Sequence, residues 1–224
     1  MNTILQASDT KLRILNAAEK LFAQHGLAAT SLRAITAEAG VNLASVNYHF
    51  RSKEELIRAM YRRRLAPINQ RRLEMLDQAE REAAPKPAPL EKILDALLDP
   101  LLEAKGSDAG AGVQVLLGRV YAEPGGIAVQ MLKEQMAEAG QRFAAALHRA
   151  LPKLSRAELA WRMHFVIGAL AHTLVAGKLL EYISGGECSA DDTEGAHRNM
   201  IAFALAGLNA PPLKTTAPAR RVKS

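Results

Sequence analysis

Apolar residues recur at every third or fourth position through residues 10–208, with little of the alternation that marks β-strands. Alanine and leucine outnumber the β-branched and aromatic types in this stretch. The pattern predicts an all-α chain. A first helix should end at Gly26, where a left-handed cap is expected, and a short second helix should begin after Thr30 or Ser31 and end at Gly40.

Further helix starts also carry capping residues. Asn42 should cap a third helix that runs through Tyr48, with Val46 pointing inward beside Phe50. Ser52 precedes a long fourth helix, whose acidic first turn suits the helix dipole. Beyond a proline-rich linker at residues 83–89, helical patterns resume at residues 90–103, 113–123, 127–151, 155–184 and 191–208.

These elements divide the chain into a compact three-helix domain over residues 1–52, a helical body over 53–210 and a basic tail over 211–224, which we expect to be disordered. The 224 residues carry a net charge of +6, and the basic excess lies at the two ends. Residues 1–82 hold 13 basic and 9 acidic side chains. A basic end beside a mildly acidic body indicates that one part meets a polyanion, with nucleic acid as the first candidate.

The cysteine count and the apolar stretches limit the other classes. Cys188 is the single cysteine, so an internal disulfide and a multi-cysteine zinc site are excluded. The chain has no uncharged apolar run of membrane-spanning length and begins without a secretory signal, which predicts a cytoplasmic protein. His164 and His172 are eight residues apart rather than four, so we expect no metal there, and no cofactor.

The candidate functional residues lie around the glycine-containing turn over residues 39–42, which joins two short helices as in a helix-turn-helix. In that motif the second helix enters the major groove, where Asn47 can pair bidentately with adenine and Ser45 can join the base readout. Hydroxyl, imidazole and ammonium donors suit the phosphate backbone. The candidate DNA contacts are Thr30, Ser31, Arg33, Asn42, Leu43, Ala44, Ser45, Asn47, Tyr48, His49 and Lys53.

Residues 14–56 closely resemble the TetR family of bacterial transcriptional regulators. The resemblance is carried by Ala17-Ala18-Glu19-Lys20-Leu21-Phe22, Gly26, Thr30-Ser31-Leu32-Arg33-Ala34-Ile35, Ala39-Gly40-Val41 and Tyr48-His49-Phe50-Arg51-Ser52-Lys53-Glu54-Glu55-Leu56. Asn47 and Ala44 depart from it, because many members have tyrosine and glycine there. The resemblance implies a homodimeric repressor, not an enzyme, that binds a near-palindromic double-stranded DNA operator and is released by a small molecule bound in its C-terminal domain.

Residues 41–50 are further similar to the fatty-acid-responsive regulators of the PsrA type. This similarity favours an apolar effector, a fatty acid or acyl thioester first and a hydrophobic xenobiotic second. The candidate effector residues are adaptable methionines and polar side chains of the body: Arg119, Tyr121, Met131, Gln135, Met163 and His164. The last two long helices are the expected dimer interface, with the candidates Ala169, Leu170, Thr173, Phe203 and Leu205.

Two other classes compete with a DNA-binding regulator. An amphipathic binder of anionic membrane surfaces would use the arginines of the fourth helix, which we otherwise interpret as a solvated face rather than a second phosphate patch: Arg62, Arg63, Arg64, Arg71 and Arg72. The ordered helix-turn-helix motif would then be unexplained, and no membrane partner is expected. An enzyme is disfavoured because the chain has no nucleophile elbow, phosphate-binding glycine loop or paired catalytic signature.

Overall fold

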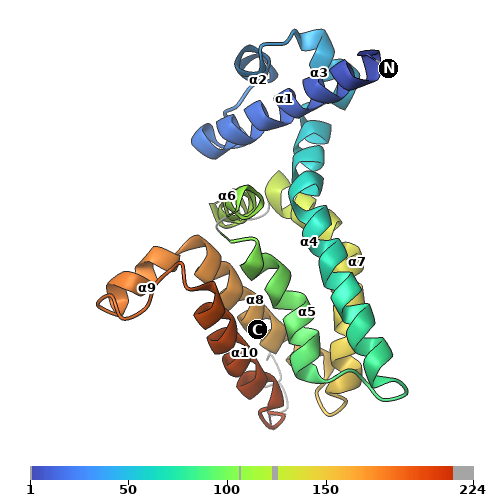
Figure 1. Ribbon diagram of the computed structural model, residues 1–224, viewed down its shortest axis with the longest axis vertical. Helices are drawn as coiled ribbons and strands as arrows, with labels where there is room; N and C mark the ends of the chain where they lie inside the picture. The colour runs from blue at the N-terminus through green and yellow to red at the C-terminus, as the bar shows by residue number, and fades with distance from the viewer. Residues whose placement is uncertain (1, 106, 123–125, 214–224) are drawn as a thin grey trace, which may run out of the picture.

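The computed structural model describes residues 2–105, 107–122 and 126–213. Within these ranges the chain forms ten helices and no strand, which confirms the all-α prediction. Figure 1 shows α1, α2 and α3 grouped at one end of the molecule, with α5 to α10 at the other. The long helix α4 runs from one group into the other.

The first group is a small domain of α1 (Asn2–His25), α2 (Leu32–Ala39) and α3 (Leu43–Phe50). Its core is made by side chains that are at most 4% exposed: Ile14, Ala18, Phe22, Ile35, Val46 and Phe50. The predicted caps form, since Gly26 has a positive φ of 85° and the side chains of Ser31 and Asn42 accept hydrogen bonds from the amides of Ala34 and Ser45.

Helix α4 (Lys53–Ala83) begins at the predicted Ser52 cap and ends just before the prolines of the linker. Its 31 residues span about 46 Å. Its first turns pack on α1 and α3, and its later turns pack on α5 (Leu90–Glu103) and α7 (Ile127–Ala150). The small domain is therefore continuous with the body through one helix.

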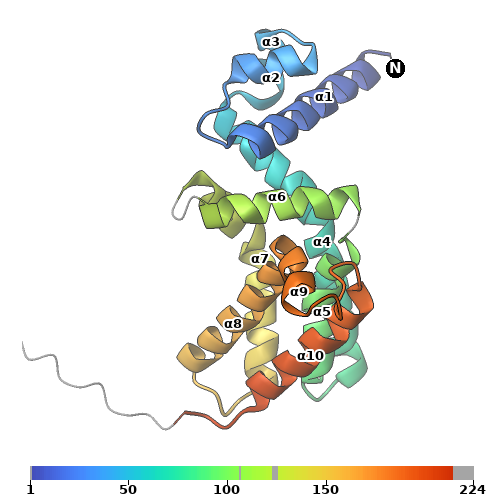
Figure 2. The same ribbon diagram turned by 90° about the vertical axis from the view of Figure 1, so that its left-hand side faces the viewer.

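The rest of the body packs around α5. Helix α10 (Thr193–Asn209) lies against α5 and α8 (Arg156–Val175), and α6 (Asp108–Ala122) lies across the end of the body that faces the small domain (Figure 2). Helix α6 begins five residues before the predicted start at Val113, and its predicted end at Glu123 lies outside the described residues. Buried side chains form one continuous core from α1 to α10.

The prediction of one helix over residues 155–184 is wrong. Helix α8 ends at Val175, and after Ala176, which leaves the helical conformation, the short α9 (Gly177–Ile183) continues at an angle of 84°. At the bend Gly177 lies so close to the loop between α9 and α10 that an added Cβ would be 3.2 Å from the Cβ of Ala190. Helix α9 buries none of its residues and projects from the body (Figures 1 and 2).

No single helix of the described chain has the length and apolar character needed to cross a membrane, and only the sharply bent pair α8–α9 reaches them together. The expected disordered tail falls, from Lys214 onward, outside the described residues.

Candidate nucleic-acid interface

The helix-turn-helix geometry depends on Gly40, which ends α2 in the left-handed conformation with φ +62° and ψ +40°. Its amide donates to the carbonyls of Thr36 and Ala37, which closes the last turn of α2. From α1, the Nη2 of Arg13 donates to the carbonyl oxygens of Ala39 and Gly40 at 2.7 and 3.0 Å. The turn is thus fixed from both sides.

Helix α3 presents a solvent-exposed face because Val46 and Phe50 anchor its other side in the core of the small domain, at 0% and 4% exposed. The exposed face carries Leu43, Ala44, Asn47 and Tyr48, the last 80% exposed, with Ser45 and His49 half-buried beside it. The structure therefore brings the predicted base-contacting residues together on one free surface.

Several of the predicted contacts are already partly engaged. The Oδ1 of Asn42 accepts from the amide and hydroxyl of Ser45 at 2.8 and 3.0 Å, so Asn42 is a helix cap whose free donor is its Nδ2. The Nζ of Lys53 donates to the carbonyl of Ala28 at 3.3 Å and lies 6.0 Å from the centre of the Phe22 ring. An ammonium has further donors, so Lys53 can still face a phosphate.

Thr30 is the exception among the candidates. Its side chain is buried, at 3% exposed, and its hydroxyl donates to the carbonyl of Gly26 at 2.8 Å. Thr30 therefore holds the α1–α2 turn rather than offering its hydroxyl to a phosphate, while Ser31 and Arg33 next to it are exposed. The prediction failed because threonine and serine look alike as caps, and only the three-dimensional packing decides which one faces inward.

Sequence reasoning missed two arginines of this domain. Arg13 lies on α1, outside the recognised motif, yet it holds the turn that orients α3. Arg51 is exposed between α3 and α4 with a positive φ of 59°, a conformation that costs free energy for a residue other than glycine. Its basic side chain beside the exposed end of α3 adds a candidate backbone contact.

The arginines of α4 do not form one solvated face. Arg64 is paired with Glu19, and Arg63 donates to the side chain of Asn16 at 2.7 Å. Arg72 is buried at 4% exposed, with its Nε donating to the carbonyl of Leu97 at 2.8 Å, and burial lowers its pKa to about 10. Arg62 and Arg71 remain exposed. Three of the five arginines are therefore engaged with other residues of the same chain, and two remain free for an anionic surface.

The predicted effector residues do not surround one cavity. Met131 is fully buried in the core, and Gln135 is half-buried on the same helix. Tyr121, 59% exposed, and His164 are solvent-exposed. Met163 lines an open groove between α7 and α8, and Arg119 belongs to a separate hollow at the junction with the small domain. The candidates were chosen by residue type, which does not reveal the side of the helix on which each lies.

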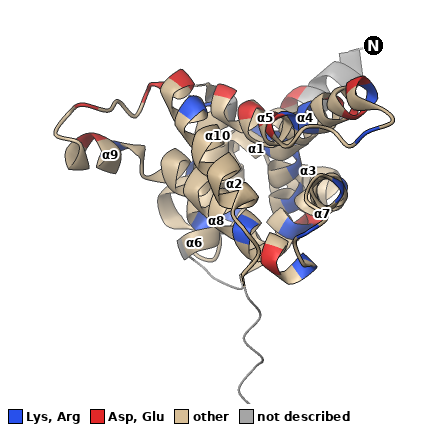
Figure 3. Cartoon of the chain, turned by 90° about the horizontal axis from the view of Figure 1, so that it is seen from below, with Lys and Arg blue, Asp and Glu red and all other residues tan. Residues whose placement is uncertain are grey.

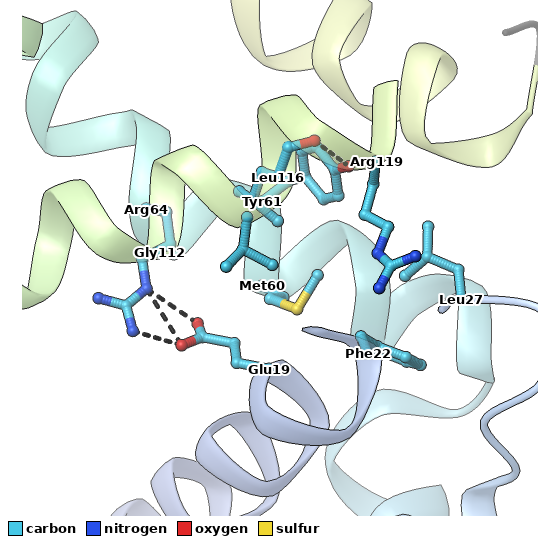
Figure 4. A pocket seen from close by; sticks show the side chains of 10 residues that line it. Glu19, Phe22, Leu27, Met60, Tyr61, Arg64, Gly112, Leu116 and Arg119 are labelled. Carbon is cyan, nitrogen blue, oxygen red and sulfur yellow. Dashed lines mark hydrogen bonds and ion pairs between the residues drawn. The ribbon is translucent and has the colours of Figure 1, made fainter. Parts of the chain in front are cut away.

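The junction hollow lies between α1, α4 and α6 (Figure 4). Figure 4 shows Glu19 of α1 bound by Arg64 of α4, with Phe22, Met60 and Leu116 closing the space beside them. From α6, the Nη2 of Arg119 donates to the carbonyl of Ala23 in α1 at 2.6 Å. The junction hollow has a volume of about 40 Å³, which leaves no room for an acyl chain. The contacts around it therefore serve to fasten the small domain to the body.

Most of the predicted dimer residues point into their own chain. Leu170 is 4% exposed in the core, Ala169 and Leu205 pack against that core, and the hydroxyl of Thr173 donates to the carbonyl of Ala169 at 2.9 Å. Only Phe203, 60% exposed, lies on a free face. Leu170 is therefore corrected, because it is covered within its own chain, whereas Ala169, Thr173 and Leu205, which are half-buried in the single chain, stay predictions together with Phe203.

The large apolar residues that α8 and α10 expose are mostly not the predicted dimer residues. On α8, Trp161 and Phe165 are 63% and 60% exposed, and their ring centroids are 5.9 Å apart. Val175 continues this face, and Phe203 lies on α10. Helix α9 adds exposed Tyr182 and Ile183, and acidic residues follow along α9 and the next loop (Figure 3).

The two parts of the chain match two family profiles. Residues 14–60 match the family described as bacterial regulatory proteins, tetR family, and residues 95–207, half of the chain, match the family described as tetracyclin repressor-like, C-terminal domain. The helix-turn-helix and the helical body thus define a bacterial DNA-binding regulator. The chain belongs to the TetR family of transcriptional regulators. These are DNA-binding proteins rather than enzymes, in agreement with the prediction.

Individual relatives support the same assignment. The transcriptional regulator UidR of Escherichia coli K12 is 37% identical over 59 residues, which cover 26% of this chain and 30% of UidR. SmeT of Stenotrophomonas maltophilia, solved with triclosan, shares 21% identity over 92% of this chain and 99% of its own, with a TM-score of 0.62. FadR of Bacillus subtilis, solved with stearoyl-CoA, shares 14% identity over 88% and 98%, with a TM-score of 0.58. Both structures share the fold.

Proposed function

We propose that this regulator is a repressor that binds a near-palindromic operator as a homodimer and is released by an apolar small molecule. The observation that carries the proposal is the exposed face of α3, held by Val46 and Phe50 on a domain whose turn is fixed by Arg13. Such a face can enter a major groove without rearrangement of the protein. Asn47 is assigned to base readout and Lys53 to the DNA backbone.

A homodimer is supported by the free apolar faces of α8 and α10. One recognition helix reads only a few base pairs, so useful specificity needs two of them related by a two-fold axis. Trp161 and Phe165, each about 60% exposed, form the kind of exposed aromatic patch that marks an interaction surface. The two helices present this patch away from the small domain, which leaves α3 free for DNA.

The effector is best accommodated in the groove between α7 and α8. Its volume of about 580 Å³ falls in the range of small-molecule sites, and its lining is more apolar than that of the hollow of about 500 Å³ between α4 and α5. The groove has an apolar floor that includes Leu159 and Met163, with His148 and Arg156 among its lining. An apolar floor beside basic groups suits a fatty acid or acyl thioester, the class suggested by the PsrA-type similarity. A neutral xenobiotic such as the triclosan bound by SmeT is the second candidate.

Release requires that the effector favours one conformer over another. A ligand that binds both conformers equally well shifts nothing, so the effector must prefer the one in which the two α3 helices no longer match successive major grooves. Helix α4 and the Arg119 contact to the Ala23 carbonyl connect the body to the small domain. They are the proposed route of coupling.

The test is a mobility shift on genomic fragments, titrated in salt. We expect tight, competitor-resistant binding to one fragment, and Asn47→Ala should lose ~1–3 kcal/mol and relax preference at one base pair. Lys53→Ala should weaken all sequences about equally and lower the salt slope by about one. Lys86→Ala, an exposed lysine in the distant linker, is the control. Failure to retain any fragment against competitor would end the DNA-binding proposal.

The same protein–DNA complexes then receive saturating fatty acids, acyl thioesters and a library of apolar compounds. Release is expected for one class, and Ala160→Trp, which fills the groove, should abolish release while DNA binding persists. Ala137→Trp on the exposed surface of α7 is the matched control. Complexes that survive every compound would refute the effector part alone.

A further inference from the structure

We infer that Asp95, Asp99 and His197 form a binding site for one divalent transition-metal ion that links α5 to α10. The two aspartates are four residues apart on α5, so they share one face of that helix. His197 comes from α10, which packs against α5. The three side chains offer one ligand atom each, and these atoms all lie within 4.8 Å of one another.

The distances around the histidine suit coordination with small adjustments. The Nε2 of His197 lies 3.4 Å from the Oδ1 of Asp95 and 2.6 Å from the Oδ1 of Asp99. With bonds of 2.0–2.1 Å, neighbouring donor atoms on a tetrahedral zinc ion are about 3.3 Å apart. The first distance already fits, and the second needs an opening of less than an ångström, within the reach of a side-chain rotation.

A second observation concerns the two atoms that face each other inside the cluster. The Oδ1 of Asp99 and the Nε2 of His197 are both buried, and neither atom makes a hydrogen bond with any residue that the structure describes. The two atoms face each other at 2.6 Å, the distance of an ion pair. Buried polar atoms are nearly always satisfied, and two converging atoms without an assigned hydrogen bond can both serve as ligands to one cation. A cation with open coordination positions would satisfy both.

The surroundings supply orientation and access. Lys92 approaches the other oxygen of Asp95, at 3.4 Å from Oδ2, and so helps to hold Oδ1 toward the histidine. A hollow of about 500 Å³ between α4 and α5 reaches both aspartates and is lined mostly by polar residues such as Glu74 and Gln78. A hydrated ion can therefore enter, and a water molecule can complete its coordination.

The donor set selects the class of ion. One imidazole and two carboxylates suit Zn²⁺ or a neighbouring first-row ion, whereas Mg²⁺ and Ca²⁺ prefer oxygen ligands alone. Two ionised aspartates with a neutral histidine also balance the charge of a divalent ion. The competing arrangement is an ordinary ion pair between His197 and Asp99, which would bind no metal.

The experiment uses the untagged full chain, stripped with a chelator and titrated with Co²⁺, whose visible absorption reports its ligands. Zn²⁺ binding is then measured by equilibrium dialysis and elemental analysis. We expect one ion per chain, and at least a ten-fold loss of affinity in His197→Gln and in Asp99→Asn. His25→Gln and Asp191→Asn, which alter exposed residues of the same types, should bind as the unmodified protein does. Zn²⁺ should also raise the melting temperature of the unmodified protein and of both controls.

Asp95→Asn removes one ligand but keeps the His197–Asp99 contact, so a loss of metal binding in this variant cannot be attributed to the loss of that contact. Circular dichroism verifies the fold of each variant. Absence of stoichiometric binding would overturn the inference and leave an ion pair. Undiminished binding by His197→Gln, or a response to Mg²⁺ that equals the response to Zn²⁺, would overturn it as well. Operator binding by the same samples is a separate measurement, so the metal site and the repressor function can fail independently.

Discussion

Gly40 shows how a single residue sets the geometry of the DNA-binding face. Its positive φ of 62° lets the chain turn from α2 into α3, and an added Cβ would lie 2.9 Å from the Nη2 of Arg13. The arginine end can move, so the backbone strain of a non-glycine residue is the main cost. We expect Gly40→Ala to lower the free energy of unfolding by about 1 kcal/mol in urea denaturation.

Gly140 provides the matched control. It lies in the middle of α7, is exposed, and has no heavy atom within 4 Å of an added Cβ. Glycine is a poor helix former, so Gly140→Ala should raise the free energy of unfolding by about 0.5–1 kcal/mol. A Gly40→Ala variant that is as stable as the unmodified protein, or more stable, would show that the turn tolerates a side chain.

Local interactions explain which residues could be assigned from the sequence. The caps at Ser31, Asn42 and Ser52 were predictable because each hydrogen bond spans only three residues. The burial of Arg72 was not, because it depends on a carbonyl 25 residues away that folding brings close. The Asp95–Asp99–His197 cluster was hidden for the same reason, since about a hundred residues separate His197 from the two aspartates.

At the scale of elements, the link between α4 and α7 depends on pH. Arg58 donates to Glu134 at 2.8 Å, and this hydrogen bond is the main cause of the lowered pKa of Glu134. A carboxyl group with a lowered pKa in the folded state stabilises the fold above its ordinary pKa of about 4.3 and loses this contribution as the pH falls through the lowered value. Arg58 also pairs with Glu54 and Glu55, so Glu134→Gln weakens the link between the helices and leaves these two pairs within α4 in place.

We therefore expect Glu134→Gln to melt below the unmodified protein at pH 7. The difference should shrink below about pH 4 and vanish when the carboxyl group is protonated in both states. Thermal unfolding across this range measures it, with Glu138→Gln, an exposed glutamate one turn further along α7, as the control. A difference that stays constant with pH would mean that packing, rather than the ion pair, is responsible.

Helix existence was more predictable than helix orientation. The 3.6-residue period marked α5 at its observed bounds, because apolar residues repeat on one face. The period continues through Ala176 without a break, so the 84° bend between α8 and α9 could not be predicted. Which side of α8 is free also follows only from its neighbours: Leu170 is covered, whereas Phe165, five residues earlier, is 60% exposed.

At the scale of the whole molecule, we expect the exposed patch on α8 to determine the oligomeric state. Trp161 and Phe165 expose two large rings side by side, and burying a ring of this size contributes about 1.5–3 kcal/mol. In a two-fold symmetric dimer each substitution occurs twice, and a glutamate there would also bury a charge. Phe165→Glu should therefore weaken the dimer by at least roughly a hundred-fold.

Sedimentation equilibrium at micromolar concentration checks this expectation. The unmodified protein should sediment as a dimer and Phe165→Glu as a monomer of 24.2 kDa. Leu12→Glu, which changes an exposed apolar residue on α1 far from the patch, should remain dimeric. Because two linked recognition helices bind an operator far more tightly than one, the monomer should also lose operator affinity while α3 itself is unchanged. A monomeric unmodified protein, or a Phe165→Glu variant that stays dimeric, would place the interface elsewhere or remove it.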